Sequence, residues 1–178
     1  MTRLWNATVA TGIAERILQY ADSVSLCFSK GLGAPVGSIV AGDKAFIQRA
    51  HCTGKPTAAE ACQGGILAAA ALHAIKHQLP KLAEDHRRAK AFAEALHQMS
   101  GIHVLPETVE TNIVIFEVDP KKIDAADLVR QLQVNGVLMF QFGLTRIRAV
   151  MHLHINRRRC GVCTICFSQN TGVILTGF

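Results

Sequence analysis

One stretch, Asp22-Ser-Val-Ser-Leu-Cys-Phe-Ser-Lys30-Gly-Leu-Gly-Ala-Pro-Val-Gly37, decides the fold of the chain. Its partly alternating apolar residues up to Phe28 predict a strand, and the glycines and the proline after Lys30 predict a tight loop before a second strand over 36–41. A lysine at the end of an apolar strand is expected to be buried, and burial lowers the pKa of an amine because it disfavours the charged form. A neutral amine is a nucleophile, so Lys30 is a candidate for Schiff-base chemistry. The alternative is an exposed lysine that opens an ordinary turn.

The sequence on both sides of this stretch predicts a mixed α and β architecture. Upstream, the apolar spacing favours a helix over 4–20 that is interrupted at Thr11-Gly12. Downstream, a helix is expected to begin near Asp124 and to end at Asn135-Gly136. The remaining elements are expected over 43–49, 63–77 and 80–100 as helices, and over 102–105, 112–118, 137–142 and 146–152 as strands. This alternation makes residues 80–155 a compact α+β unit.

Length and composition exclude several classes of protein. The 178 residues suffice for one domain, or for a small domain and part of another. With 49% hydrophobic and 18% charged residues, the composition is that of a globular protein. No apolar run approaches the ~20 residues needed to span a bilayer, and the N-terminus has no apolar signal core, so we expect a cytoplasmic protein without a membrane partner. The net charge of +6 comes with one Trp and one Tyr, which argues against a nucleic-acid partner.

A cysteine motif lies near the C-terminus. Cys160, Cys163 and Cys166 form Cys-x-x-Cys-x-x-Cys, and His152 and His154 precede them. This spacing is compatible with zinc or an iron–sulfur cluster. No second Cys-x-x-Cys pair accompanies it, so we expect no metal and interpret residues 156–178 as a divergent tail.

The Lys30 stretch resembles the cofactor-lysine segment of the low-specificity L-threonine aldolases, which are pyridoxal-phosphate (PLP) enzymes of fold type I. The resemblance covers residues 3–50 and 63–154, through Arg3-Leu-Trp-Asn-Ala, Gln63-Gly-Gly-Ile-Leu-Ala, Thr111-Asn-Ile-Val and Arg146-Ile-Arg-Ala-Val-Met-His152. It implies an α/β protein that is the C-terminal portion of PLP fold type I. Residues 1–79 would form a partial large-domain sheet, and residues 80–155 the small α+β domain.

The resemblance also implies an activity and a site. Members cleave L-threonine and L-allo-threonine to glycine and acetaldehyde, and they assemble as homo-oligomers. By position, Lys30 would be the catalytic lysine that binds PLP covalently. Arg148 would bind the carboxylate of the amino-acid substrate, for which a planar bidentate donor is suited. Arg3 would lie near both cofactor and substrate.

The chain departs from the family pattern in two ways that bear on activity. In the family, the loop that cradles the cofactor phosphate and the aspartate that partners the pyridine nitrogen lie upstream of the segment matching Arg3. Cys62 stands where the family has an arginine that contacts the cofactor phosphate. These departures favour an alternative, in which the chain is a non-catalytic truncated remnant, such as a pseudogene or splice product, without aldolase activity.

Overall fold

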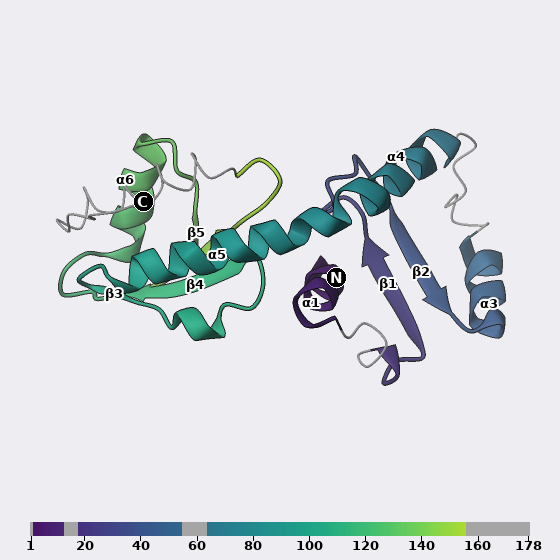
Figure 1. Cartoon of the computed structure of the whole chain (residues 1–178), viewed down its shortest axis with the longest axis horizontal. Coiled ribbons are helices and arrows are strands. Elements are labelled where there is room, and N and C mark those ends of the chain that lie inside the picture. The colour runs from purple at the N-terminus through teal and green to yellow at the C-terminus, as the bar shows by residue number, and fades with distance from the viewer. Residues whose placement is uncertain (1, 13–17, 55–63, 156–178) are drawn as a thin grey trace. The chain divides into compact units, whose positions relative to one another are not determined.

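The computed structural model describes residues 2–12, 18–54 and 64–155 (Figure 1). The chain divides into two compact units between Ala83 and Glu84, and each unit is described by itself. The domain boundary expected after residue 79 stays a prediction, and the expected tail over 156–178 lies outside the described residues. Within the described ranges, no helix has both the length and the apolar character needed to cross a bilayer.

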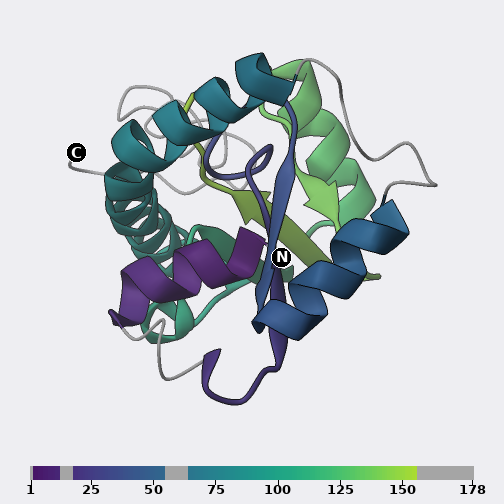
Figure 2. The same cartoon turned by 90° about the vertical axis from the view of Figure 1, so that its right-hand side faces the viewer.

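Unit 1 consists of helices around a two-stranded antiparallel sheet. Its elements are α1 (Thr2–Thr11), β1 (Ser23–Cys27), β2 (Ser38–Gly42), α3 (Lys44–Gly54), α4 (Gly64–His77) and η2 (Leu79–Lys81). β1 and β2 pair in register from Ser23 opposite Gly42 to Cys27 opposite Ser38. In Figure 2, α1 lies beside β1 and α3 beside β2. The small core of this unit comprises Phe28, Leu32, Ala34, Ala74 and Leu82, with Trp5 and Val9 packed against it.

Local sequence signals explain several boundaries in unit 1. The helix predicted over 4–20 ends at Thr11, because Gly12 adopts a positive φ of 66° that terminates it. The two predicted strands are present as β1 and β2. α3 begins after Asp43, whose carboxylate accepts a hydrogen bond from the Phe46 N–H at 2.6 Å.

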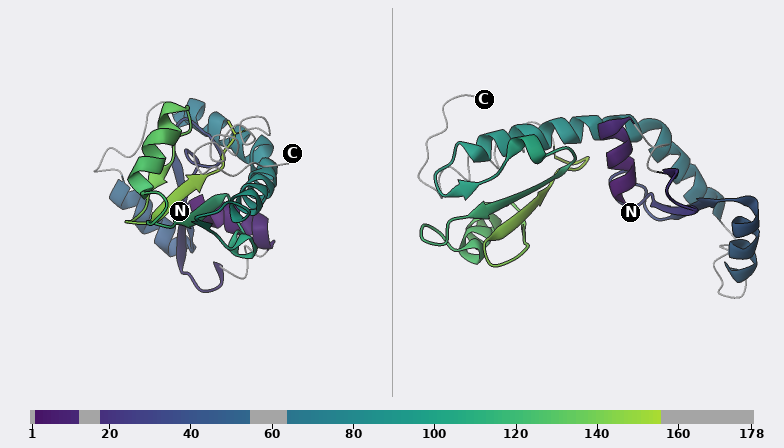
Figure 3. Two further views of the ribbon diagram at one scale, coloured as in Figure 1. Left: turned by 90° about the vertical axis from the view of Figure 1, so that its left-hand side faces the viewer. Right: turned by 90° about the horizontal axis from the view of Figure 1, so that it is seen from below.

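Unit 2 is a four-stranded antiparallel sheet covered on one face by two helices. Its elements are α5 (Leu82–His97, most of which belongs to this unit), β3 (Ile102–His103), η3 (Pro106–Thr108), β4 (Ile113–Val118), α6 (Ala125–Val134), β5 (Phe140–Gln141) and β6 (Arg146–Val150). The strand order is β3-β4-β6-β5. The right-hand view of Figure 3 shows α5 running along this sheet. The predicted α+β character of this half of the chain is confirmed.

Side-chain alternation gives the sheet of unit 2 a buried face and an open face. Val114 and Phe116 of β4 and Ile147 of β6 pack against α5 and α6 in one core. The residues between them, such as Ile115 and Arg148, therefore lie on the other face. α6 begins at Asp124, whose carboxylate accepts from the Ala126 and Asp127 N–H groups, and ends at Asn135-Gly136, as the sequence predicts.

Candidate active site

The loop that carries Lys30 follows β1 and is fixed by its own backbone. The Phe28 N–H donates to the Gly37 carbonyl at 2.9 Å, and the Ala34 N–H donates to the Phe28 carbonyl at 3.0 Å. The Gly33 N–H donates to the Lys30 carbonyl at 2.9 Å. These bonds tie the two ends of the loop together and close a turn directly after the lysine.

Lys30 is exposed, and its neighbours in the loop are buried. Phe28, Leu32 and Ala34 enter the core of unit 1, whereas Lys30 lies at an outward position between them. The expectation that the strand end would bury this lysine is therefore wrong. Apolar side chains occupy the inward positions of the loop. The Lys30 amine lies on the solvent side, where a carbonyl compound can reach it.

Two glycines of the loop adopt conformations that other residues avoid. Gly33 has φ +67° and Gly37 has φ +117°. An L side chain at either position would be strained, because Cβ clashes with the backbone at positive φ. The glycines after Lys30 thus give the loop its shape.

A thiol beside Lys30 has an unusual environment that the sequence analysis did not single out. Cys27 Sγ and Ser29 Oγ are hydrogen-bonded at 3.2 Å. Hydrogen bonds from the Ser29 side chain and backbone lower the pKa of the Cys27 thiol, and the nearby Lys30 charge adds to this effect. The only sequence signal was a serine two residues after the cysteine, which is too common a spacing to be informative.

Arg148 lies in the middle of β6, on the open face of the unit 2 sheet. It is half-buried and stands directly opposite Ile115 of β4 and Phe140 of β5. Its neighbour on the same face, Arg146, forms an ion pair with Glu117, with 2.6 Å between Arg146 Nε and Glu117 Oε1. Arg148 thus occupies a position in the sheet between a residue with an aliphatic side chain and one with an aromatic side chain.

A cavity of about 530 Å³ lies next to this face of the sheet. It is lined by His97, Ile102, His103, Val104, Leu105, Thr108, Ile115, Glu117 and Arg146. The cavity reaches Ile115, the cross-strand neighbour of Arg148, but Arg148 does not line it. It is therefore adjacent to the candidate carboxylate site rather than part of it.

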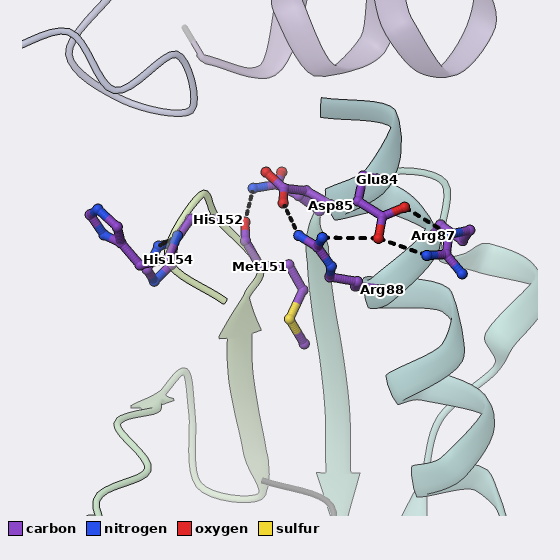
Figure 4. Close-up of polar contacts among 8 residues, drawn as sticks. Glu84, Asp85, Arg87, Arg88, Met151, His152 and His154 are labelled. Carbon is purple, nitrogen blue, oxygen red and sulfur yellow. Dashed lines mark hydrogen bonds and ion pairs between the residues drawn. The ribbon is translucent and has the colours of Figure 1, made fainter. Parts of the chain in front are cut away.

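A polar cluster lies where the first turns of α5 meet the end of β6 (Figure 4). Arg88 bridges two carboxylates, with 3.2 Å from Nη1 to Asp85 Oδ1 and 2.9 Å from Nη2 to Glu84 Oε1. Arg87 makes a two-pronged contact with the same Glu84, at 2.6 and 2.8 Å. The side chain of Asp85 is only 3% exposed. Burial raises the pKa of Asp85, and the charges of Arg88 and His152 oppose that rise.

The predicted site residues are distributed over both units. Lys30 and the helix that carries Arg3, α1, belong to unit 1, where α1 packs against β1. Arg148 belongs to unit 2. Cys62 and the Cys160, Cys163 and Cys166 motif lie outside the described residues. Within residues 2–12, 18–54 and 64–155, no group of three or more His, Cys, Asp or Glu side chains could hold a metal ion.

Solved structures define the class to which this fold belongs. A Listeria monocytogenes protein assigned to the L-allo-threonine aldolases matches 95% of this chain and 50% of its own, with a TM-score of 0.72 and 22% identity. Ornithine aminotransferase from Toxoplasma gondii, described with PLP at its active site, matches 92% of this chain and 40% of its own, with a TM-score of 0.62 and 22% identity. The fold is therefore that of part of a PLP enzyme of fold type I, as the sequence predicted.

Sequence comparison narrows the class to a family. The model of the beta-eliminating lyase family matches residues 1–120, so the chain belongs to that family. Low-specificity L-threonine aldolase 1 of Arabidopsis thaliana is 41% identical over 169 residues, which are 94% of this chain and 47% of the relative. The low-specificity L-threonine aldolase of Escherichia coli K12 is 37% identical over 158 residues, 88% of this chain and 45% of the relative. The chain spans about half the length of these curated relatives, and its predicted resemblance to threonine aldolases is confirmed.

Proposed function

We propose that the chain is part of a PLP-dependent threonine aldolase that cleaves L-threonine and L-allo-threonine to glycine and acetaldehyde. The observation that carries this proposal is the 41% identity to a low-specificity L-threonine aldolase over 94% of the chain. Cleavage breaks the Cα–Cβ bond, removes the proton of the β-hydroxyl group and returns a proton to Cα. The reaction consumes no oxidant, reductant or water, as expected of a lyase.

Lys30 supplies one group that PLP requires, a primary amine. The aldehyde of PLP needs an accessible primary amine, and Lys30 presents one on the exposed side of a loop with a fixed backbone. When bound, PLP supplies a ring that accepts the electron pair released from the Cα–Cβ bond. The proposal assigns Lys30 as the catalytic and cofactor-binding residue and assigns Arg3 to the vicinity of both cofactor and substrate.

Arg148 is proposed to bind the carboxylate of the amino-acid substrate. A guanidinium offers two parallel N–H donors that match the two carboxylate oxygens. Arg148 is half-buried on this sheet face, and a charge-assisted hydrogen bond is stronger where the local dielectric constant is lower. Binding at this position would hold Cα in one orientation while the Cα–Cβ bond is broken.

The proposal extends to assembly and location. We propose a homo-oligomer in the cytoplasm that acts on a small amino acid and has no nucleic-acid or membrane partner. The second candidate remains a remnant without catalytic activity. One observation favours it: Cys62 stands where the family pattern has an arginine.

Capture of PLP at Lys30 tests the proposal. The purified chain is incubated with PLP, reduced with borohydride and mapped by peptide mass spectrometry. Lys30→Ala is compared with Lys76→Ala, which removes an exposed lysine from α4. We expect a stoichiometric adduct at Lys30 that survives Lys76→Ala and is absent from Lys30→Ala. Scattered, substoichiometric labelling would establish the remnant instead.

A further inference from the structure

A buried asparagine forms hydrogen bonds with the residue that follows β6. The Met151 N–H donates to the Asn112 carbonyl at 2.8 Å, and Asn112 Nδ2 donates back to the Met151 carbonyl at 2.7 Å. Asn112 is 7% exposed and Met151 is 4% exposed, so water does not compete for these bonds. Figure 4 shows Met151 at the end of β6, beside the start of α5.

The side chain of Asn112 continues the β4–β6 ladder by one pair. Ile113, the first residue of β4, stands opposite Val150, the last residue of β6, so Asn112 and Met151 form the next pair outward. In this pair the side-chain amide donates to the Met151 carbonyl, as a strand N–H does in an antiparallel ladder. Beyond this point the chain turns, and the Ile155 N–H donates to the His152 carbonyl at 2.8 Å.

This end of β6 depends on β4 alone. β5 pairs only with Ile147 and Arg148, so the last residues of β6 have one neighbouring strand among the described residues. At the other end of the strand, Arg146 Nε forms an ion pair with Glu117 Oε1 at 2.6 Å. That pair is solvent-exposed and contributes little to stability. Of these two side-chain contacts, the buried Asn112–Met151 bond is therefore the stronger.

The register of β6 decides the face on which Arg148 lies. Side chains of a strand alternate between its faces, so a slip of one residue would move Arg148 from the open face to the core. We infer that Asn112 is a positioning residue for Arg148: its side-chain hydrogen bond to the Met151 carbonyl, beside the backbone bond between the same two residues, extends the β4–β6 ladder past the end of β6 and so helps to hold the register that places Arg148 on the open face. This inference rests on the proposed function, in which Arg148 binds the substrate carboxylate.

The test compares two Asn→Asp substitutions in the full chain. Asn112→Asp keeps the shape but replaces the Nδ2 donor with an oxygen that faces the Met151 carbonyl. Asn135→Asp is the matched control, because Asn135 Nδ2 also donates to a backbone carbonyl, that of Gln131 at 2.8 Å, but at an exposed helix end. The readouts are amide hydrogen exchange over 146–151, the affinity of the PLP-treated chain for glycine from isothermal titration calorimetry, which also applies to a variant without Arg148, and PLP capture at Lys30.

We expect Asn112→Asp to speed exchange over 146–151 and to weaken glycine binding, each by about tenfold, the usual effect of losing one buried hydrogen bond. PLP capture at Lys30 should be unchanged, which a general loss of structure would not allow. Asn135→Asp should match the unsubstituted chain in all three measurements. If Asn112→Asp does not unfold cooperatively, Asn112→Ser replaces it, since the shorter hydroxyl side chain leaves the Met151 carbonyl without its donor.

Two outcomes separate the inference from the proposed function. Arg148→Lys should weaken glycine binding more than any other variant. If it does, and the Asn112 variants bind glycine as the unsubstituted chain does, the positioning inference is overturned and the role of Arg148 stands. If the unsubstituted chain and Arg148→Lys bind glycine equally, the proposed carboxylate site is wrong, and the positioning inference falls with it.

Discussion

The loop that carries Lys30 is held by bonds between residues close in sequence, whereas the strand that carries Arg148 is held by bonds between residues far apart. The hydrogen bond between Phe28 and Gly37 closes the Lys30 loop within a segment of ten residues. The Asn112–Met151 bond spans 39 residues and the Glu117–Arg146 bond spans 29. The hydrogen bonds of the loop therefore need only its local sequence, whereas those of the strand need the sheet of unit 2.

The two regions also differ in the packing that surrounds them. The Arg148 strand lies over the larger core of unit 2, which includes Phe92, Phe116 and Leu128. In unit 1, β2 is exposed along its whole length, and Ile66 and Leu72 of α4 are exposed as well. We therefore expect the two candidate site residues to respond to different substitutions, and the predictions below test that independence.

The largest effect should come from the core of unit 2. Phe116 is 1% exposed, and Phe116→Ala should lower the free energy of unfolding of this unit by about 3–5 kcal/mol, because it leaves a cavity under the sheet. Hydrogen exchange should quicken over 146–151 but stay unchanged over 28–37. Phe140→Ala is the control, since Phe140 is 65% exposed and its loss should cost no more than about 0.5 kcal/mol. Equal acceleration in both regions would contradict the independence of the units.

The converse experiment acts on the Lys30 loop. Gly37→Ala should destabilise the loop by about 1–2 kcal/mol, because φ at this position is +117°. PLP capture at Lys30 should fall, while exchange over 146–151 is unaffected. The control is Gly65→Ala in α4, where an added Cβ meets nothing within 4 Å and should stabilise the helix by about 0.5–1 kcal/mol. Full PLP capture by the Gly37 variant would show that the loop does not need this backbone conformation.

A smaller effect is expected at the start of α6. Asp124→Ala removes the carboxylate that accepts from the Ala126 and Asp127 N–H groups, which should lower the free energy of unfolding by about 1 kcal/mol. Asp127→Ala, which breaks an exposed ion pair with Arg130, should cost less than about 0.5 kcal/mol. Denaturant titrations followed by circular dichroism distinguish the two. A cost at Asp127 equal to that at Asp124 would disprove the capping role.

The smallest expected effect is a pH dependence at Asp85. Burial raises the pKa of this carboxyl in the folded chain above its unfolded value, so the folded state binds the proton more tightly. Stability should therefore increase as the pH falls from above the raised pKa towards the ordinary carboxyl range. Asp85→Asn should lack this increase, while Asp127→Ala should retain it. Parallel pH profiles for the unsubstituted chain and Asp85→Asn would contradict the assignment.

Local sequence signals predicted the parts of the structure that local forces determine. The strand–loop–strand around Lys30 and the helix from Asp124 to Asn135-Gly136 were found as expected, because turn glycines and capping residues act on their own neighbours. The strands predicted over 102–105 and 137–142 shrink to two residues each, β3 and β5. The adjacent strands β4 and β6 are longer, so the lengths of β3 and β5 depend on where the chain turns away from the sheet, which periodicity does not reveal.

The candidate site was predicted only in part, for the same reason. The motif identified Lys30 but not its exposure, which depends on Phe28 and Leu32 filling the core of unit 1. Asn112 was part of a matching segment, yet its bonds to Met151 follow from the pairing of β4 with β6. The type of a residue determines which chemistry it can perform. Its burial and its hydrogen-bond partners depend on contacts between distant parts of the chain.

The β1–β2 ribbon has a consequence for the chain while it is being made. Among the described residues, these two strands pair only with each other, so each presents a row of unpaired N–H and C=O groups. The ribbon leaves the ribosome before the sheet of unit 2 has been synthesised, and a two-stranded ribbon is only marginally stable alone. Until unit 2 has formed, the open edges of this ribbon are groups that can form non-native strand pairs.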